Sequence, residues 1–188
     1  ESGKTDKTKI YNFMNNDILK LKDISHKFNK IGSKPKLEEL NTEVLIKEVT
    51  AYYKNKLPKS SKVKIRILRR NKDVCSIIHG DKILLYWAFE NIIKNAIDAV
   101  NNNGEIVLSI NQIKNYLIID FTDNGEGVPR INKKNIFKPG FSTKSRGWGL
   151  GLNLSKRIIE KMHGGKLILL NSKITQTTFR VKLRISVS

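Results

Sequence analysis

The sequence predicts an α+β fold, a two-layer sandwich of a mixed, largely antiparallel sheet and helices, with one long helix ahead of it. Three observations lead to this prediction. Strand-like segments occur in adjacent pairs with amphipathic segments between them. A chain of 188 residues with 39% hydrophobic residues can bury one core of ordinary size. The segment before the first strand pair has the apolar spacing of a helix instead.

Residues 10–31 form the predicted long helix, because their apolar residues recur at intervals of three and four. Gly32 and Pro35 end it, since glycine suits a helix C-cap and proline disfavours helix in the residue before it. We therefore divide the chain into residues 1–34 and a main domain, residues 35–188. A lone helix cannot bury its apolar stripe, so this one needs a partner surface. The stripe is formed by Ile10, Phe13, Met14, Ile18, Leu21, Ile24, Phe28 and Ile31.

In the first half of the main domain, the sequence predicts two helices and two strands. Residues 42–57 indicate a helix that Pro58 stops. Residues 63–67 alternate apolar and basic side chains with the period of a strand, and residues 74–78 indicate a second strand. Asp81 is the expected N-cap of a long helix that ends near residue 100.

The second half predicts two strand pairs separated by a long loop and a helix. Residues 105–110 and 116–122 form the first pair, residues 150–162 the helix, and residues 166–170 and 178–185 the second pair. The loop over residues 123–147 has about 25 residues, which is too long for a simple connector. We expect the helices to cover one face of the sheet.

The chain carries a net charge of +19, and residues 54–72 contain nine Lys or Arg and no Asp or Glu. Such a surface attracts anions. Nucleic acid is not the expected partner, because Lys outnumbers Arg, aromatic residues are not interleaved, and no known DNA- or RNA-binding motif occurs. A solvated Lys-rich surface is the simplest interpretation; an acidic partner protein or an anionic membrane face remain alternatives.

The longest apolar stretches, residues 83–87 and 117–119, are far shorter than the roughly 20 residues that cross a bilayer. The chain starts at Glu1 with no signal-like segment, so we expect a piece of a longer cytoplasmic protein whose membrane contacts, if it has them, lie upstream. The single Cys75 lies in an apolar alternation and is expected to be a buried thiol, which fits a reducing compartment.

Three polar residues lie on the helix expected over residues 81–100. Asn91, Asn95 and Asp98 are four and three apart and therefore share a side of it. A carboxamide oxygen suits Mg²⁺ and a carboxamide nitrogen donates to phosphate oxygens. The alternative is that both carboxamides only bond nearby backbone.

Asp123 follows a strand and precedes Gly125 and Gly127, which let the backbone turn sharply beside a flat ligand. A carboxylate there could accept a hydrogen bond from an adenine amino group. Taken alone, such an acidic glycine turn is more typical of a plain connection between strands.

Gly147, Gly149 and Gly151 alternate where a helix begins, so bare N–H groups and the positive end of the helix dipole favour phosphate. The spacing matches neither the Walker pattern nor the dinucleotide fingerprint. Lys144 and Arg146 either pair with phosphate oxygens or are solvated loop charges.

In this order and spacing, the clusters resemble the Bergerat ATP-binding superfamily, which gyrase, heat-shock chaperone ATPases, histidine kinases and MutL share. Residues 90–96 resemble its N box, residues 123–127 its first glycine box, residues 136–144 its F box and residues 147–152 its second glycine box. Phe137 and Pro139 favour the histidine kinases of two-component systems. The resemblance therefore implies the Bergerat fold, ATP and Mg²⁺.

The resemblance also implies roles for individual residues. Asn91 and Asn95 would hold Mg²⁺ and phosphates, with Asp98 on the same side of the helix, and Asp123 would bind the adenine amino group. Glu90 would act as a base or polariser on the acceptor histidine, unless it is a surface acid paired with Lys94. The remaining expected contacts are Gly125 and Gly127 at the base, Thr143, Lys144 and Arg146 in the lid over ATP, Gly147, Gly149, Leu150 and Gly151 at the phosphates, and Thr177 at the adenine through water.

Two departures from the family pattern qualify these expectations. Gln176 stands where the family often has glycine, which weakens the assignment of Thr177. Asn91 stands where the gyrase, chaperone and MutL branch has the Glu that activates water, which favours transfer to an acceptor over hydrolysis.

None of the three histidines, His26, His79 and His163, has the sequence context of a phosphoacceptor. Residues 1–34 instead resemble the second helix of a dimerisation hairpin whose first helix is missing. The resemblance thus implies a protein-histidine kinase that phosphorylates a histidine outside this chain, with a homodimeric parent and a response regulator as partner. The alternatives are an ATPase clamp of the MutL or chaperone kind and a serine kinase of the anti-sigma kind.

Overall fold

The computed structural model describes residues 32–71, 74–144 and 148–186, together with Ile10, Tyr11, Met14, Asn15, Ile18, Lys22, Ser25 and Lys30. The chain divides into two compact units, Glu1–Pro35 and Lys36–Ser188. In the first unit, the described residues from Ile10 to Lys30 are all helical, and Ile10, Met14 and Ile18 are exposed. The predicted stripe residues Phe13, Leu21, Ile24, Phe28 and Ile31 lie outside the described residues, so the continuous helix stays a prediction.

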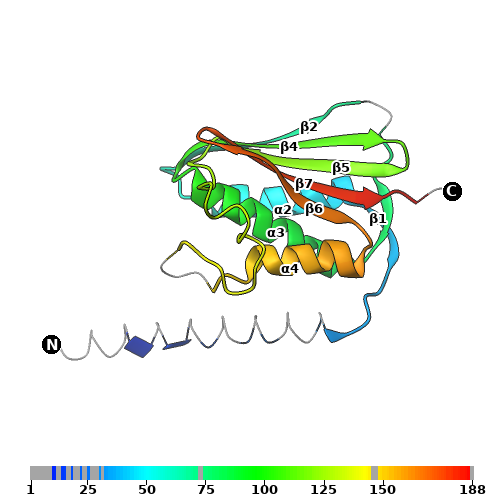
Figure 1. Cartoon of the computed structure of the whole chain (residues 1–188), viewed down its shortest axis with the longest axis horizontal. Helices are drawn as coiled ribbons and strands as arrows, with labels where there is room; N and C mark the ends of the chain where they lie inside the picture. Colours follow the sequence, from blue (N-terminus) through cyan, green and yellow to red (C-terminus); the bar gives the residue numbers. More distant parts are fainter. Residues whose placement is uncertain are drawn as a thin grey trace. The chain divides into compact units, whose positions relative to one another are not determined.

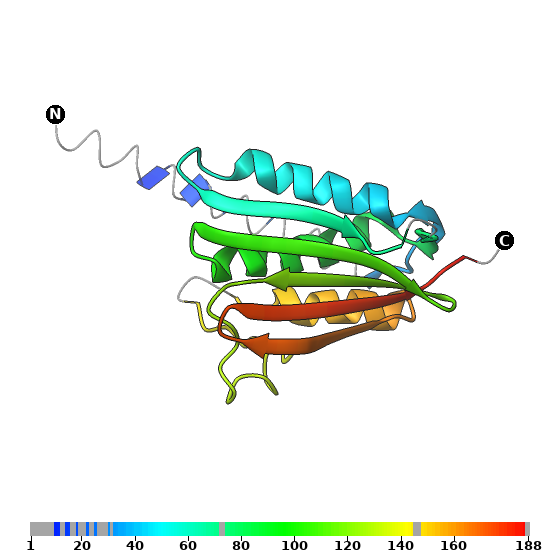
Figure 2. The ribbon, with the colours of Figure 1, turned by 90° about the horizontal axis from the view of Figure 1, so that it is seen from above.

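The second unit is an α+β sandwich, as the sequence predicts. Its five-stranded sheet has the order β2-β4-β5-β7-β6, in which β2 runs parallel to β4 and the other neighbours are antiparallel. Helices α2, α3 and α4 lie together on one face of this sheet (Figures 1 and 2). The elements are β2 (Lys62–Arg69), β4 (Asn103–Ile113), β5 (Tyr116–Asp123), β6 (Lys166–Lys173), β7 (Gln176–Arg184), α2 (Thr42–Lys56), α3 (Lys82–Ala99) and α4 (Gly151–Arg157).

Two tight hairpins form four of the five strands of the sheet. The β4–β5 hairpin turns at Lys114, whose φ is 53°, and the β6–β7 hairpin turns at Thr175, whose φ is 71°. These are the two strand pairs that the sequence predicts, and most of the observed strands are longer than predicted. The end of β5 and the start of β7 are in register at Asp123 and Thr177, which brings two predicted site residues together.

The strand expected over residues 74–78 is only partly confirmed. The observed β3 covers Ile77–Gly80 and pairs with β1, Glu38–Asn41, in a separate two-stranded sheet. Side chains hold the residues before it: the Gln112 side-chain oxygen accepts from the Cys75 N–H at 2.8 Å, and Arg69 donates to the Val74 carbonyl at 2.8 Å. The backbone there forms no ladder because these side chains take its polar groups. Strand β1 was not predicted, since its four residues show no apolar alternation.

The core lies between the sheet and the helices. Phe89 of α3 packs against Phe121 of β5 with ring centroids 5.7 Å apart, and both are fully buried. The helix predicted over residues 150–162 is α4 followed by a π-helical turn, η1 (Ile158–Met162). Among the described residues, none of the helices is both long and apolar enough to cross a membrane.

Candidate nucleotide site

The site is organised by α3, which a capping network fixes at its start. The Asp81 carboxylate accepts from the N–H groups of Ile83 at 3.1 Å and Leu84 at 3.2 Å, which confirms its predicted role as N-cap. His163 accepts from the Asp81 N–H at 3.0 Å, and burial lowers the pKa of this histidine. A neutral His163 thus has a structural role as hydrogen-bond acceptor for the backbone at the start of α3.

Asn91, Asn95 and Asp98 occupy one side of α3, as expected from their spacing, and the lid lysine reaches them. Lys144 donates to the Asn95 side-chain oxygen at 3.1 Å and to the Asp98 carboxylate at 2.5 Å. Asn91 approaches the start of α4, because a Cβ built on Gly151 would lie 3.2 Å from the Asn91 side-chain oxygen. The structure therefore brings the N box, the lid and the second glycine box together.

The ammonium group of Lys144 shows that the side-chain oxygens on α3 can bind a cation. A cation already fits between the Asn95 oxygen and the Asp98 carboxylate, so these oxygens can hold positive charge. Among the described residues, no three His, Cys, Asp or Glu side chains are grouped as a metal site. A Mg²⁺ ion here would take oxygen ligands from asparagine and from phosphate, which is compatible with its preference for few protein ligands.

Asp123 ends β5 with its carboxylate inside the protein. The residue is 3% exposed, and its carboxylate accepts from the Gly125 N–H at 3.0 Å. Burial raises the pKa of Asp123 to about 6, against the opposing effect of that N–H group. The carboxylate is thus mainly ionised at neutral pH, and it is available as an acceptor for an amino group.

Thr177 lies opposite Asp123 in the β5–β7 ladder and is also 3% exposed. Its hydroxyl has no hydrogen-bond partner among the described residues. A buried unpartnered hydroxyl is costly and is found where a ligand or water completes it. Thr178, the next residue, instead bonds Thr122 across the strands at 3.0 Å. The position of Thr177 thus fits the adenine contact that the sequence predicts, despite Gln176 beside it.

Gly125 and Gly127 are required by close backbone approaches. A Cβ on Gly125 would lie 2.5 Å from the Ala99 carbonyl oxygen at the end of α3. Gly127 has a φ of +81°, and its Cβ would lie 2.8 Å from the Lys173 carbonyl oxygen in the β6–β7 hairpin. The first glycine box is therefore clamped between α3 and this hairpin.

The sequence analysis missed the residues that form this clamp. Thr175 donates its N–H to the Gly125 carbonyl at 3.0 Å, Lys133 donates to the Ser172 carbonyl at 2.6 Å, and Ser172 accepts from the Val128 N–H at 2.7 Å. The hairpin lies about fifty residues downstream of the glycine box, and only the strand pairing brings the two together. The two glycines were the available signal, because each marks a close approach.

The lid is closed at its base by two glycines. The Gly140 N–H donates to the Gly149 carbonyl at 3.1 Å, and a Cβ on Gly149, whose φ is +65°, would lie 2.3 Å from the Gly140 carbonyl carbon. Phe137 anchors the F box by an edge contact with Phe179 at 6.2 Å between centroids. Gly149 is thus required for this close backbone approach to Gly140, which is a structural reason for its place in the motif.

The remaining predicted residues differ in how they are placed. Thr143 is exposed, and Leu150 is the half-buried residue that precedes α4. Arg146 and Gly147 lie outside the described residues. The start of α4 is held to α3 by Ser155, which donates to the Ala88 carbonyl at 3.1 Å.

Glu90 lies one residue before Asn91 and hence on a different side of α3. The Tyr53 hydroxyl of α2 donates to its carboxylate at 3.5 Å, and burial together with Glu90 raises the pKa of Tyr53. This carboxylate therefore faces α2 and lies on a different side of α3 from Asn91.

Together these residues define an ATP-binding domain of the Bergerat kind. We call the buried Asp123 carboxylate and Thr177 hydroxyl the base end, and the Asn91 and Asn95 carboxamides with Lys144 the phosphate end, after the roles that the sequence predicts for them. The comparison with known families agrees. Residues 80–187 match the family described as histidine kinase-, DNA gyrase B-, and HSP90-like ATPase, which is more than half of the chain, and the chain belongs to this family.

The related sequences are histidine kinases. Sporulation kinase C of Bacillus subtilis (strain 168) is 37% identical over 114 residues, which cover 61% of this chain and 26% of that protein. The sensory histidine kinase/phosphatase NtrB of Azospirillum brasilense is 32% identical over 134 residues, covering 63% of this chain and 33% of that protein. The chain thus spans a quarter to a third of these relatives.

Solved structures show the same fold. The catalytic domain of the histidine kinase ThkA has a TM-score of 0.70 and 28% identity, over 79% of this chain and 95% of that one. The structure of ThkA in complex with the response regulator protein TrrA has a TM-score of 0.74 over 93% of this chain and 50% of that one; at 24% identity this likeness concerns the fold alone.

Proposed function

We propose that this chain is the catalytic part of a Mg²⁺- and ATP-dependent protein-histidine kinase, acting in two-component signal transduction. The observation that carries the proposal is that one domain contains both a buried Asp123 opposite an unpartnered Thr177 hydroxyl and a polar side of α3 where Asn95 binds the Lys144 ammonium group. Of its sequence relatives, one is named as a sporulation kinase and another as a sensory histidine kinase/phosphatase, which supports transfer rather than hydrolysis.

In this proposal the residues mainly position ATP. Asp123 accepts from the adenine amino group, and Thr177 contacts the base through water. Asn91 and Asn95 hold Mg²⁺, which would neutralise phosphate charge. Phosphoryl transfer needs such alignment and charge neutralisation more than covalent chemistry from the protein. The lid residues Thr143, Lys144 and Arg146 and the second glycine box, with Gly147, Gly149, Leu150 and Gly151, complete the phosphate end.

The acceptor is a histidine outside this chain, on the first helix of a dimerisation hairpin whose second helix is residues 1–34. The parent is then a cytoplasmic or membrane-anchored homodimer that passes the phosphoryl group to a response regulator. Asn91 stands where a hydrolytic Glu would stand in the clamp ATPases, and this position argues for transfer.

The test uses the chain with radiolabelled Mg²⁺·ATP and a separately produced hairpin that carries a candidate histidine. We expect acid-labile, base-stable label on the hairpin, and none on a hairpin whose histidine is replaced by glutamine. Free phosphate without labelled hairpin would instead identify a clamp ATPase, and an acid-stable phosphoprotein would identify a serine kinase.

Two variants of α3 separate binding from transfer. Asn95→Ala removes a proposed Mg²⁺ ligand and should lower both ATP binding and transfer. Glu90→Gln should leave ATP binding unchanged and reduce transfer by about 100-fold, a typical contribution of a general base. Transfer at the full rate by Glu90→Gln would show that Glu90 takes no part in the transfer step.

A further inference from the structure

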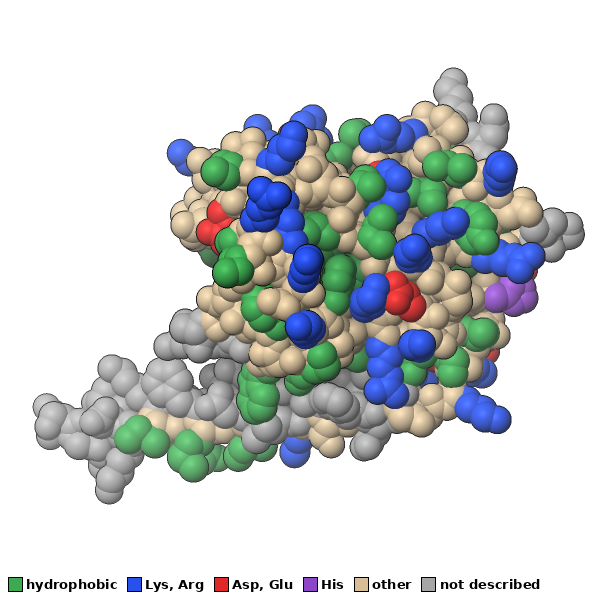
Figure 3. All heavy atoms as spheres, viewed as in Figure 1, with side chains coloured by type: hydrophobic (Ala, Val, Ile, Leu, Met, Phe, Trp, Pro, Cys, Tyr) green, Lys and Arg blue, Asp and Glu red, His purple; other side chains and the backbone are tan. Residues whose placement is uncertain are grey.

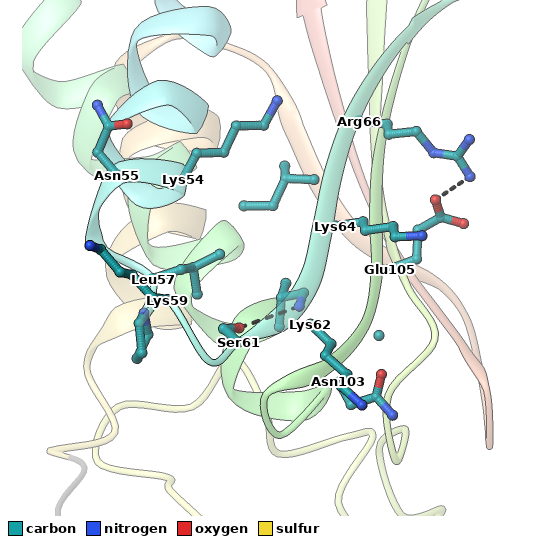
Figure 4. Close-up of a pocket in the computed structure, with 14 residues that line it drawn as sticks. Lys54, Asn55, Leu57, Lys59, Ser61, Lys62, Lys64, Arg66, Asn103 and Glu105 are labelled. Carbon is teal, nitrogen blue, oxygen red and sulfur yellow. Dashed lines mark hydrogen bonds and ion pairs between the residues drawn. The ribbon is translucent and has the colours of Figure 1, made fainter.

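A groove separate from the nucleotide site lies between the C-terminal end of α2 and the edge strand β2 (Figure 4). It has a volume of about 920 Å³ and shares no lining residue with the nucleotide site. Its wall contains the first five residues of β2 and the first three of β4. We call this feature the basic groove.

Four lysines without acidic partners surround the basic groove. Lys54, Lys59, Lys62 and Lys64 line it and are exposed, and among the described residues no carboxylate lies within 4.0 Å of their ammonium groups. The fifth cation, Arg66, forms an ion pair with Glu105. Other lysines of the domain do have acidic partners, for example Lys82 with Glu48 and Lys156 with Glu160. The groove therefore holds unbalanced positive charge.

Net charge alone does not single out this place, because Lys and Arg side chains are spread over the face drawn in Figure 3. What distinguishes the groove is its shape and its floor. Leu57 and Val63 line it and are half-buried, and Ile65 is 5% exposed. Figure 4 shows Lys54 on the α2 side of β2, and Lys64 with Arg66 on the other side. Cations thus border the apolar floor from two sides.

This arrangement suits an extended polypeptide. Alternate side chains of an extended segment point to opposite sides, so acids on such a segment can reach both groups of lysines. The Val63 N–H already donates to the Ser61 hydroxyl at 3.3 Å, so recognition falls on side chains more than on this strand edge. A bilayer is a poor fit to a concave surface. Nucleic acid is a poor fit because the described residues that line the groove include no aromatic side chain, and the one arginine among them is paired.

We propose that the basic groove docks an extended acidic segment of a partner protein, in which apolar residues alternate with Asp and Glu. The lysines supply charge complementarity and the floor takes the apolar residues. This proposal does not depend on ATP binding or on phosphoryl transfer.

The test measures binding of a fluorescent twelve-residue peptide with the repeat Asp-Leu-Glu-Val, by anisotropy and without nucleotide. The double variant Lys62→Glu with Lys64→Glu reverses two groove charges. The matched control, Lys161→Glu with Lys166→Glu, makes the same change in net charge at exposed residues near the opposite edge strand, β6. We expect the groove variant to bind at least tenfold more weakly and the control within about twofold of the parent, as for local against distant charge changes.

Two comparisons address specificity. A peptide of equal charge with Ser in place of Leu and Val should bind several-fold more weakly. Binding to a twelve-nucleotide single-stranded DNA or to phosphatidylserine vesicles should be the same for the groove variant and the control variant. Urea unfolding and the milder Lys62→Gln with Lys64→Gln variant check that the fold survives.

Several results would overturn the proposal. Equal weakening by both double variants would assign binding to net charge. A preference for DNA or vesicles that depends on Lys62 and Lys64 would assign the groove to that partner instead. Absence of peptide binding would leave the β2 lysines as protection of an edge strand against unwanted pairing.

Discussion

At the base end of the nucleotide site, Asp123 and Thr177 are each 3% exposed, whereas at the phosphate end the side chains of Lys144 and Asp98 are 45% and 38% exposed. The base end is fixed by backbone contacts between α3, the first glycine box and the β6–β7 hairpin. The phosphate end is held by exposed side chains and by the backbone contact between Gly140 and Gly149. Changes at the base end should therefore alter stability together with nucleotide affinity, and changes at the phosphate end should alter affinity alone.

The largest effect is expected from Gly125→Ala. Its Cβ would lie 2.5 Å from the Ala99 carbonyl, where only backbone could yield. Overpacking of this kind costs about 1–3 kcal/mol of unfolding free energy, and displacement of the loop should lower ATP affinity more than about tenfold. Urea unfolding and calorimetric titration with ATP measure both quantities. Gly32→Ala is the matched control, since a Cβ there meets nothing within 4 Å; an unaffected Gly125→Ala would contradict a rigid base end.

The next effect is expected from Asp123→Asn. The change keeps an acceptor for the Gly125 N–H but removes the charge that favours the adenine amino group, which corresponds to about 1.5–3 kcal/mol, or roughly 10- to 100-fold in ATP affinity. GTP serves as the reference nucleotide, because the preference of the protein for ATP over GTP should be smaller in the variant. Unchanged discrimination would remove Asp123 from base recognition.

The same variant tests the pKa of Asp123. The pKa of this carboxyl is raised to about 6 in the folded protein, above its ordinary value of 3.8, so the folded state binds more protons between these values. Relative to Asp123→Asn, the parent should lose stability as the pH rises from about 4 to 6 and then level off. ATP affinity should rise over the same window, as the carboxyl ionises. Urea unfolding at several pH values measures the difference, and a flat difference would contradict a desolvated carboxyl.

A smaller effect is expected from Thr177→Val. This change removes a buried hydroxyl without a partner among the described residues, so stability should rise by up to about 1 kcal/mol while ATP affinity falls about fivefold. Thr178→Val is the matched control, because it breaks the 3.0 Å bond to Thr122 and should cost about 1 kcal/mol without changing ATP affinity. The opposite pattern would place the adenine contact elsewhere.

The smallest effect is expected from Lys144→Gln at the phosphate end. Its contacts with Asn95 and Asp98 are exposed, so stability should change by less than about 0.5 kcal/mol. Affinity for ATP should fall by a few-fold and affinity for AMP should not change, because in the proposed function the lysine contacts the distal phosphates. Lys138→Gln, at another exposed lysine of the F box, is the control. A large loss of stability would show that the lid is structural.

The sequence predicted the helices and the paired strands because their apolar periods are local properties of the chain. It predicted Asp81 as a helix cap and Asn91, Asn95 and Asp98 as one side of α3 for the same reason. It was wrong about the start of β3, where Arg69 and the sequence-distant Gln112 bind the backbone with their side chains. Strand β1 was missed because four residues carry too little pattern.

By itself, the sequence determined the residue types of the site, their order and the family that they resemble. Only the tertiary structure decided which of them meet. The Thr177 hydroxyl opposite Asp123, the hairpin that clamps Gly127, the contact of Lys144 with α3 and the orientation of Glu90 toward α2 all depend on strand register and helix packing. The physical reason is that periodicity and capping act over a few residues, whereas each of these contacts joins segments at least 37 residues apart, as Tyr53 and Glu90 are.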